Sequence, residues 1–245
     1  MTWKHFKTLV FSGILSIYCS QTWSAEARNS QSGFLDFNVY PYLSDVDNDS
    51  VFTLNIAATL PKRFSCFSLL NIGNQPADKE LGDTSNYYTE QNIRWQIHDS
   101  SPLDLTVQYN MRSGEDNDRL RFGIRWRIND SPALQSLFAK IYLSYAVNLH
   151  AIQIDDSDAR VWQLEHSFAL RFPYLSDRLY LAGFIDHTFN EDLARQIPSN
   201  PVVAEAQLGY RLIENLYIVS EYRLNEYRRS DVNNLAIGVE YKIKW

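Results

Sequence analysis

The chain has 245 residues, of which 45% are hydrophobic, 14% aromatic and 21% charged, with two cysteines. The aromatic content excludes a disordered chain, the cysteine count excludes a disulfide scaffold, and the lack of a second long apolar run excludes a helical membrane protein. The formal net charge of −6 gives no reason to expect a nucleic-acid partner, and we predict none.

Residues 1–27 have the pattern of a secretory signal peptide. A basic start precedes the apolar stretch 8–18, which is too short to cross a bilayer. Small residues at the −3 and −1 positions predict cleavage after Ala27, with cleavage after Ala25 as the alternative. We therefore expect the protein to be exported through a cleaved signal.

The mature region, residues 28–245, alternates apolar and polar residues with a period of two and lacks helical stripes. The clearest run is 103–112, in which the odd-numbered residues are apolar and the even-numbered ones polar or charged. Such runs predict twelve strands at 33–42, 51–60, 63–72, 87–97, 103–112, 119–128, 138–149, 160–172, 178–188, 202–212, 216–225 and 232–245.

The strand lengths suit tilted strands that cross hydrocarbon, and the connections are alternately long and short. This pattern predicts an all-β fold, a transmembrane antiparallel up-and-down β-barrel of about twelve strands, in a bacterial outer membrane with both termini in the periplasm. A periplasmic β-sandwich is the alternative, because it also has one apolar and one polar face.

An aromatic residue ends several of the strands that would run inward. These residues, on the apolar faces at the periplasmic interface, are Trp95, Trp126, Phe172 and Trp245, and they predict an aromatic girdle. The last strand alternates up to Trp245 and resembles the C-terminal signal of Gram-negative outer-membrane β-barrel proteins. That resemblance implies binding to the barrel-assembly machinery, beside contacts with outer-membrane lipid and lipopolysaccharide.

The opposite, polar faces would line the lumen. The charged residues predicted there as selectivity candidates are Arg94, Arg112, Arg119, Arg121, Arg125, Arg127, Glu165, Glu205, Glu221 and Glu240. Near mid-lumen we expect Arg94, Arg121 and Arg125 to face Glu165, Glu205 and Glu221. Two interpretations stay open: a water-filled pore with a transverse field, or a plug in which these charges pair across the lumen.

Several aromatic residues also fall on the polar faces: Tyr40, Tyr88, Tyr142, Tyr180, Phe184 and Tyr217. They would form either a stacking track for sugars or nucleobases, or amphipathic filler whose hydroxyls are hydrogen-bonded. His166 falls on the lipid face, where a polar group is costly, so we expect a register break or bulge there, with an oligomer contact as the alternative.

The segment Tyr109–Gly114 resembles the catalytic strand of outer-membrane phospholipase A, which is also a twelve-stranded barrel. The resemblance places Ser113 at the nucleophile position, but Met111 stands where that family has its histidine base. A serine without a base is not activated, so Ser113 is only a candidate nucleophile. We expect no metal and no cofactor, because no motif of the common soluble enzymes occurs.

These features predict a narrow channel, or porin, for small polar or charged solutes. The alternatives are a phospholipase-like lipid hydrolase or its inactive relative, and a sealed structural or adhesive barrel.

Overall fold

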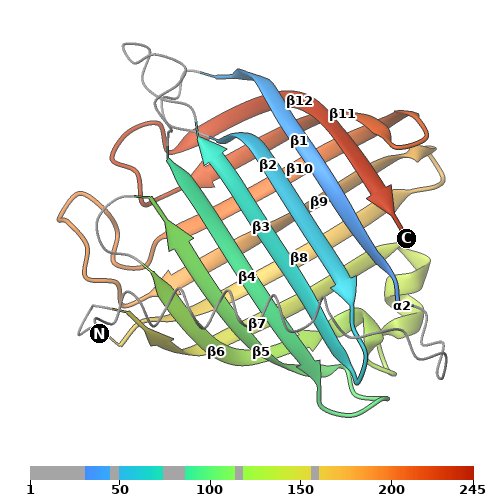
Figure 1. Cartoon of the computed structure of the whole chain (residues 1–245), viewed down its shortest axis with the longest axis horizontal. Coiled ribbons are helices and arrows are strands. Elements are labelled where there is room, and N and C mark those ends of the chain that lie inside the picture. Colours follow the sequence, from blue (N-terminus) through green and yellow to red (C-terminus); the bar gives the residue numbers. More distant parts are fainter. Residues whose placement is uncertain (1–30, 45–49, 74–85, 114–117, 156–159) are drawn as a thin grey trace, which may run out of the picture. The chain divides into compact units, whose positions relative to one another are not determined.

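A computed structural model describes residues 31–44, 50–73, 86–113, 118–155 and 160–245. The predicted signal peptide, residues 1–27, lies outside the described residues. The unit formed by Gln31–Trp245 contains twelve strands that close into a barrel (Figure 1).

The strands follow one another along the chain with one helical interruption. They are β1 (Gly33–Leu43), β2 (Ser50–Thr59), β3 (Phe64–Gly73), β4 (Tyr87–Gln96), β5 (Leu103–Arg112), β6 (Arg119–Arg127), β7 (Leu143–Ile154), β8 (Trp162–Phe172), β9 (Ser176–Phe189), β10 (Val202–Ile213), β11 (Leu216–Asn225) and β12 (Asn233–Lys244). A 3₁₀ turn, η1 (Ile128–Asp130), and a short helix, α2 (Gln135–Lys140), lie between β6 and β7. Eleven of the twelve predicted strands agree with these bounds to within two residues.

Each strand pairs antiparallel with its neighbours in sequence, and β1 pairs with β12 to close the sheet. Backbone hydrogen bonds between Gly33 and Trp245 hold the end of this junction. Gly33 is needed there, because a Cβ would lie 2.6 Å from the Trp245 ring. The register of β1 shifts between Val39 and Tyr42, a segment that includes Pro41, which has no N–H to donate. The predicted up-and-down β-barrel is confirmed.

The barrel is apolar outside and polar inside. Outward side chains such as Leu105 (46% exposed) and Ile124 (48%) stand in the open, whereas the inward Gln108 (0%) and Glu240 (1%) are buried. Water-soluble folds place their apolar faces inward, so this arrangement suits a surrounding hydrocarbon phase. In the part of the chain that the structure describes, no helix is both long and apolar enough to cross a bilayer.

The prediction for the seventh strand was wrong by about five residues. We predicted 138–149, but β7 spans Leu143–Ile154. The first residues of the predicted strand, 138–140, belong to helix α2 instead. The apolar residues of this segment recur at the spacing of an amphipathic helix: Leu134, Leu137, Phe138 and Ile141.

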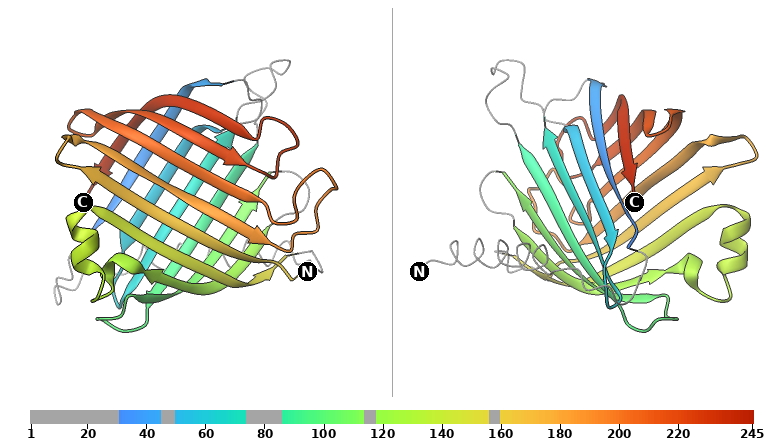
Figure 2. Two further views of the ribbon diagram at one scale, coloured as in Figure 1. Left: turned by 180° about the vertical axis from the view of Figure 1, so that it is seen from behind. Right: turned by 45° about the vertical axis from the view of Figure 1, so that its right-hand side comes forward.

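Tyr142 consequently does not face the lumen as predicted. It lies in the turn before β7 with φ 54°, and its ring contacts the Tyr174 ring edge-to-face with 5.7 Å between the centroids. Figure 2 shows α2 at the same end of the barrel as the C-terminus. We call this end, which holds Gly33 and Trp245, the terminal end, and the opposite one the loop end.

The bulge predicted at His166 is absent. His166 pairs in regular register with Val147 and Ile185 on the outer face. Its Nδ1 lies 2.6 Å from the hydroxyl oxygen of Tyr145, whose ring also stacks on Phe138 of α2. A hydrogen bond to a neighbouring tyrosine therefore satisfies this histidine without a change of register.

Candidate functional site

The lumen encloses a cavity of about 1140 Å³. Nine of the ten charged residues predicted for the lumen line it: Arg94, Arg112, Arg119, Arg121, Arg125, Glu165, Glu205, Glu221 and Glu240. The tenth, Arg127, does not line it. Arg127 lies closer to the terminal end, 3.4 Å from Asp104 and 3.0 Å from Asp130.

Among the described residues, seven positive and seven negative side chains line the cavity, and five of the seven positive ones lie apart from most of the acids. The five arginines named above come from β4, β5 and β6. The acids come mainly from the other side of the barrel: Asp36, Glu165, Asp186, Glu205, Glu221 and Glu240, with Glu90 of β4 as the exception. The lumen therefore has a positive wall and a largely negative wall.

At the β1–β12 junction the charges form direct ion pairs. Lys242 Nζ lies 2.5 Å from Glu240 Oε1 and 3.5 Å from Asp36 Oδ2. The hydroxyl of Tyr180 donates to Glu240, and Gly209 leaves room for this ring, because a Cβ there would lie 2.2 Å from a ring carbon. We call Lys242, Asp36 and Glu240 the lysine cluster.

Glu221 is also paired within its own wall. Arg223 Nε donates to Glu221 Oε1 at 2.6 Å, and the Tyr40 hydroxyl donates to Oε2 at 2.7 Å. The hydroxyls of Tyr40, Tyr88 and Tyr180 all donate to carboxylates, which is the behaviour of amphipathic filler.

On β5–β8, neutral amides contact two of the charged groups, Arg121 and Glu165. Arg121 donates through Nη1 to Gln108 Oε1 and through Nε to Gln153 Oε1, both at 2.7 Å. Glu165 accepts from Asn148 Nδ2 at 2.7 Å and from Gln108 Nε2 at 3.3 Å. We call these five residues the amide network.

We predicted that three arginines would face three glutamates across the lumen, and the structure agrees with this only in part. Both sets line the same cavity, but in the described part of the chain Arg94, Arg121 and Arg125 form no ion pair with Glu165, Glu205 or Glu221. Arg125 instead lies 3.8 Å from Asp104 on the neighbouring strand. Direct pairing across the lumen, which the plug interpretation requires, is not made by these arginines.

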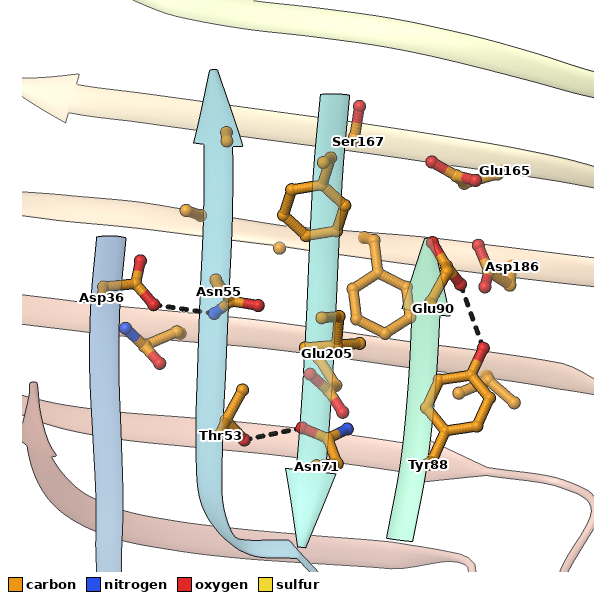
Figure 3. Close-up of a pocket in the computed structure, with 18 of the residues that line it drawn as sticks. Asp36, Thr53, Asn55, Asn71, Tyr88, Glu90, Glu165, Ser167, Asp186 and Glu205 are labelled. Atoms are coloured by element: carbon orange, nitrogen blue, oxygen red, sulfur yellow. Dashed lines mark hydrogen bonds between the residues drawn. The ribbon is translucent and has the colours of Figure 1, made fainter. Parts of the chain in front are cut away.

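Three carboxylates converge on the cavity, as Figure 3 shows for Glu90, Glu165 and Asp186. Asp186 and Glu165 are direct partners on β9 and β8, and Glu90 of β4 lines the same cavity. Glu90 accepts from Asn92 at 2.6 Å and from Tyr88 at 3.0 Å. Asp186 Oδ1 is buried without a hydrogen-bond partner among the described residues.

At the loop end, residues from two connections contact Arg119. Glu191 follows β9, and its Oε1 lies 2.8 Å from Arg119 Nη1. The same oxygen accepts a hydrogen bond of 2.7 Å from the hydroxyl of Tyr227, a residue that follows β11. Arg119 lies on β6, so the contact reaches from the β9–β11 side of the mouth to the positive wall. Burial is the main cause that raises the pKa of Tyr227 above its ordinary value, so its hydroxyl stays a donor at neutral pH.

Ser113 follows β5 at the loop end. Its Oγ accepts from the Tyr87 backbone N–H at 3.0 Å and lies 3.4 Å from Asn86 Oδ1. Among the described residues, no histidine hydrogen-bonds to it. The same residues contain no group of three or more His, Cys, Asp or Glu that could hold a metal ion.

The four residues of the predicted girdle end strands at the terminal end. Trp95 and Trp126 lie on outward positions of β4 and β6, and Phe172 and Trp245 end β8 and follow β12. Trp126 donates from Nε1 to Ser131 at 2.8 Å, and the Arg63 guanidinium lies 5.0 Å from the Trp95 ring centroid.

Sequence reasoning missed the amides and His150 as site residues. His150 is fully buried with Nε2 3.3 Å from Glu165, but the sequence placed it at the start of a connection because β7 was predicted too early. The alternation marked Gln108 and Asn148 only as polar, and nothing in the sequence says which charge each would contact.

No protein-family model and no curated protein matches the chain. Among solved structures the barrel is similar to the NanC porin, with a TM-score of 0.50, 10% identity, and coverage of 87% of this chain and 100% of that one. It is also similar to the KdgM porin, with a TM-score of 0.48, 13% identity, and coverage of 86% and 98%. At this identity the likeness to NanC shows the barrel fold.

Proposed function

We propose that this protein is a channel of the bacterial outer membrane for small polar or charged solutes. The observation that carries the proposal is the lumen: a cavity of about 1140 Å³ inside a barrel with an apolar exterior, with charges of opposite sign on opposite walls. Charged side chains in a hydrated pore select solutes by their field. The barrel fold that the chain shares with the NanC porin supports the same function.

The export and assembly steps belong to the proposal. Residues 1–27 would direct export with cleavage after Ala27, and the last strand would be read by the barrel-assembly machinery. Trp95, Trp126, Phe172 and Trp245 would lie at the periplasmic interface, where aromatic rings are favoured, in contact with lipid. The loop end would then meet lipopolysaccharide.

Within the lumen, we assign selectivity to the positive wall. Arg121 is held by two glutamine amides, and Arg94 has no hydrogen-bonded or ion-paired partner among the described residues. Their charges are therefore available to passing solutes, whereas Lys242 is neutralised in place. A sealed barrel is the weaker candidate because it would need these arginines to be paired.

The test is single-channel conductance of the refolded protein in a planar bilayer, with the reversal potential measured under a salt gradient. Discrete conductance steps are expected. A correctly folded barrel that gives no steps would overturn the proposal.

Fatty-acid release from phospholipid, compared between the wild type and Ser113→Ala, tests the enzymatic alternative in the same preparation. We expect no release from either protein, because no base contacts Ser113.

A further inference from the structure

The cavity presents two unneutralised groups of opposite sign on a single strand. Glu90 and Arg94 of β4 are four residues apart, so both side chains point inward and their Cα atoms lie about 13 Å apart along the strand. Asn92 between them is an amide, which donates to Glu90 and separates the two charges. The lumen therefore changes sign along its length as well as across it.

Among the described residues, no lysine or arginine is ion-paired with the carboxylates of Glu90, Glu165 and Asp186, and His150 Nε2 lies 3.3 Å from Glu165. Asp186 and Glu165 stand directly opposite each other on β9 and β8, and Glu90 approaches from β4 (Figure 3). Like charges on directly opposed residues are destabilising unless a positive group lies between or near them. Asp186 lines the same cavity, and it receives no hydrogen bond from the described residues, although its Oδ1 is buried.

The positive group lacks an anion. Arg94 is 9% exposed and lines the cavity, and its Nε has no hydrogen-bond partner among the described residues. Arg94 and Glu165 line the same cavity, yet the two form no ion pair. A buried guanidinium of this kind is complementary to a carboxylate, which it binds through two parallel hydrogen bonds.

We propose that the lumen binds small zwitterions, with the solute ammonium group at Asp186, Glu165 and Glu90 and the solute carboxylate at Arg94. This inference rests on the proposed channel function and names its solute class. A solute with both charges satisfies both groups at once, whereas a cation or an anion satisfies one and is repelled by the other.

The experiment compares three probes of equal chain length in single-channel recordings of the reconstituted barrel. They are γ-aminobutyric acid, its methyl ester, which is only a cation, and its N-acetyl derivative, which is only an anion. We expect the zwitterion to interrupt the current with dwell times at least about threefold longer than either analogue.

Two variants separate the ends of the site. Asp186→Asn should remove the preference for the zwitterion over the anionic analogue, and Arg94→Gln should remove its preference over the cationic one. Arg211→Gln is the matched control, because Arg211 is an exposed arginine already paired with Asp177 at 3.2 Å, and it should keep both preferences. If Asp186→Asn does not fold, Glu90→Gln tests the same end.

The outcomes distinguish the two proposals. Equal dwell times for the three probes in a conducting barrel overturn the zwitterion site and leave the channel standing. A preference for the zwitterion that survives both variants also overturns the assigned residues. A folded barrel without conductance overturns the channel and the site together.

Discussion

The lysine cluster and the amide network differ in what contacts their buried charges. Lys242 is in direct contact with two carboxylates, so its charge is neutralised within the cluster. Arg121 and Glu165 are instead contacted by neutral amides, with Gln108 hydrogen-bonded to both. Direct pairing removes a field from the lumen, whereas amides satisfy hydrogen bonds and leave the charge in place.

This difference separates a structural role from a functional one within a single lumen. The lysine cluster lies at the β1–β12 junction, where the barrel closes, and its pairs join the first and last strands. The amide network lies on β5–β8, away from that junction. We therefore expect changes in the cluster to act on stability and changes in the network to act also on selectivity.

The largest effect on stability is expected from Lys242→Met. It leaves Asp36 and Glu240 as adjacent uncompensated carboxylates, and removing one partner of a buried pair costs about 3 kcal/mol. Urea unfolding of the barrel in lipid vesicles, followed by tryptophan fluorescence, measures the loss of free energy of unfolding.

The double variant Lys242→Met with Glu240→Gln is the control, because it restores the net charge of the cluster. It should recover part of the lost stability. A single variant as stable as the wild type would mean that water, not Lys242, compensates the two carboxylates.

Gln108→Leu is expected to have the next largest effect. The change keeps the side-chain size but removes a hydrogen-bond acceptor of Arg121 and a hydrogen-bond donor to Glu165. We expect it to lower the free energy of unfolding by about 2 kcal/mol. Thr106→Val, on the same buried face of β5, is a matched control, because Thr106 Oγ1 has no partner among the described residues. If both variants lose the same stability in urea unfolding, the amide does not hold the two charges.

The strands could be read from the sequence because the alternation of apolar and polar residues is local. In the run from Leu103 to Arg112, the position of each residue in the alternation predicts the face of the sheet on which its side chain lies, and no other strand is needed. The same alternation placed Arg94 and Glu165 in the lumen. Where a 3.6-residue spacing interrupts it, at Leu134–Ile141, the strand prediction failed.

The contacts within the lumen could not be predicted in the same way. They depend on the register between strands that are far apart in sequence, such as Asp36 of β1 and Lys242 of β12. They also depend on loops that fold inward, as Glu191 does to reach Arg119. Alternation fixes the face of a residue, but only the closed barrel fixes its partner.

Tyr180→Phe tests a single hydrogen-bonding group of the lysine cluster. The variant keeps the aromatic ring, whose centroid lies 5.1 Å from Lys242 Nζ. It removes the hydrogen-bond donor to Glu240 and the acceptor for Gln207 Nε2, so we expect the free energy of unfolding to fall by about 1.5 kcal/mol. Tyr217→Phe is the control, because no described residue hydrogen-bonds to the Tyr217 hydroxyl although its ring lies 5.9 Å from Lys242 Nζ. Unfolding in urea should distinguish the two, and equal stability of both variants would count against the hydrogen bond. The reversal potential should change in neither.

Arg121→Gln should have the smallest effect on stability and a clear effect on selectivity. A glutamine at this position can donate to the Gln108 and Gln153 side-chain oxygens, so the free energy of unfolding should fall by no more than about 1 kcal/mol. Loss of an unpaired positive charge from the lumen should raise the cation-to-anion permeability ratio about threefold at low salt, and less at high salt, where the charge is screened. Arg211→Gln removes a charge that Asp177 already neutralises, so its reversal potential should match the wild type. If Arg121→Gln costs more than Lys242→Met in stability and leaves the reversal potential unchanged, the amide network is the structural element and the distinction between the two regions is reversed.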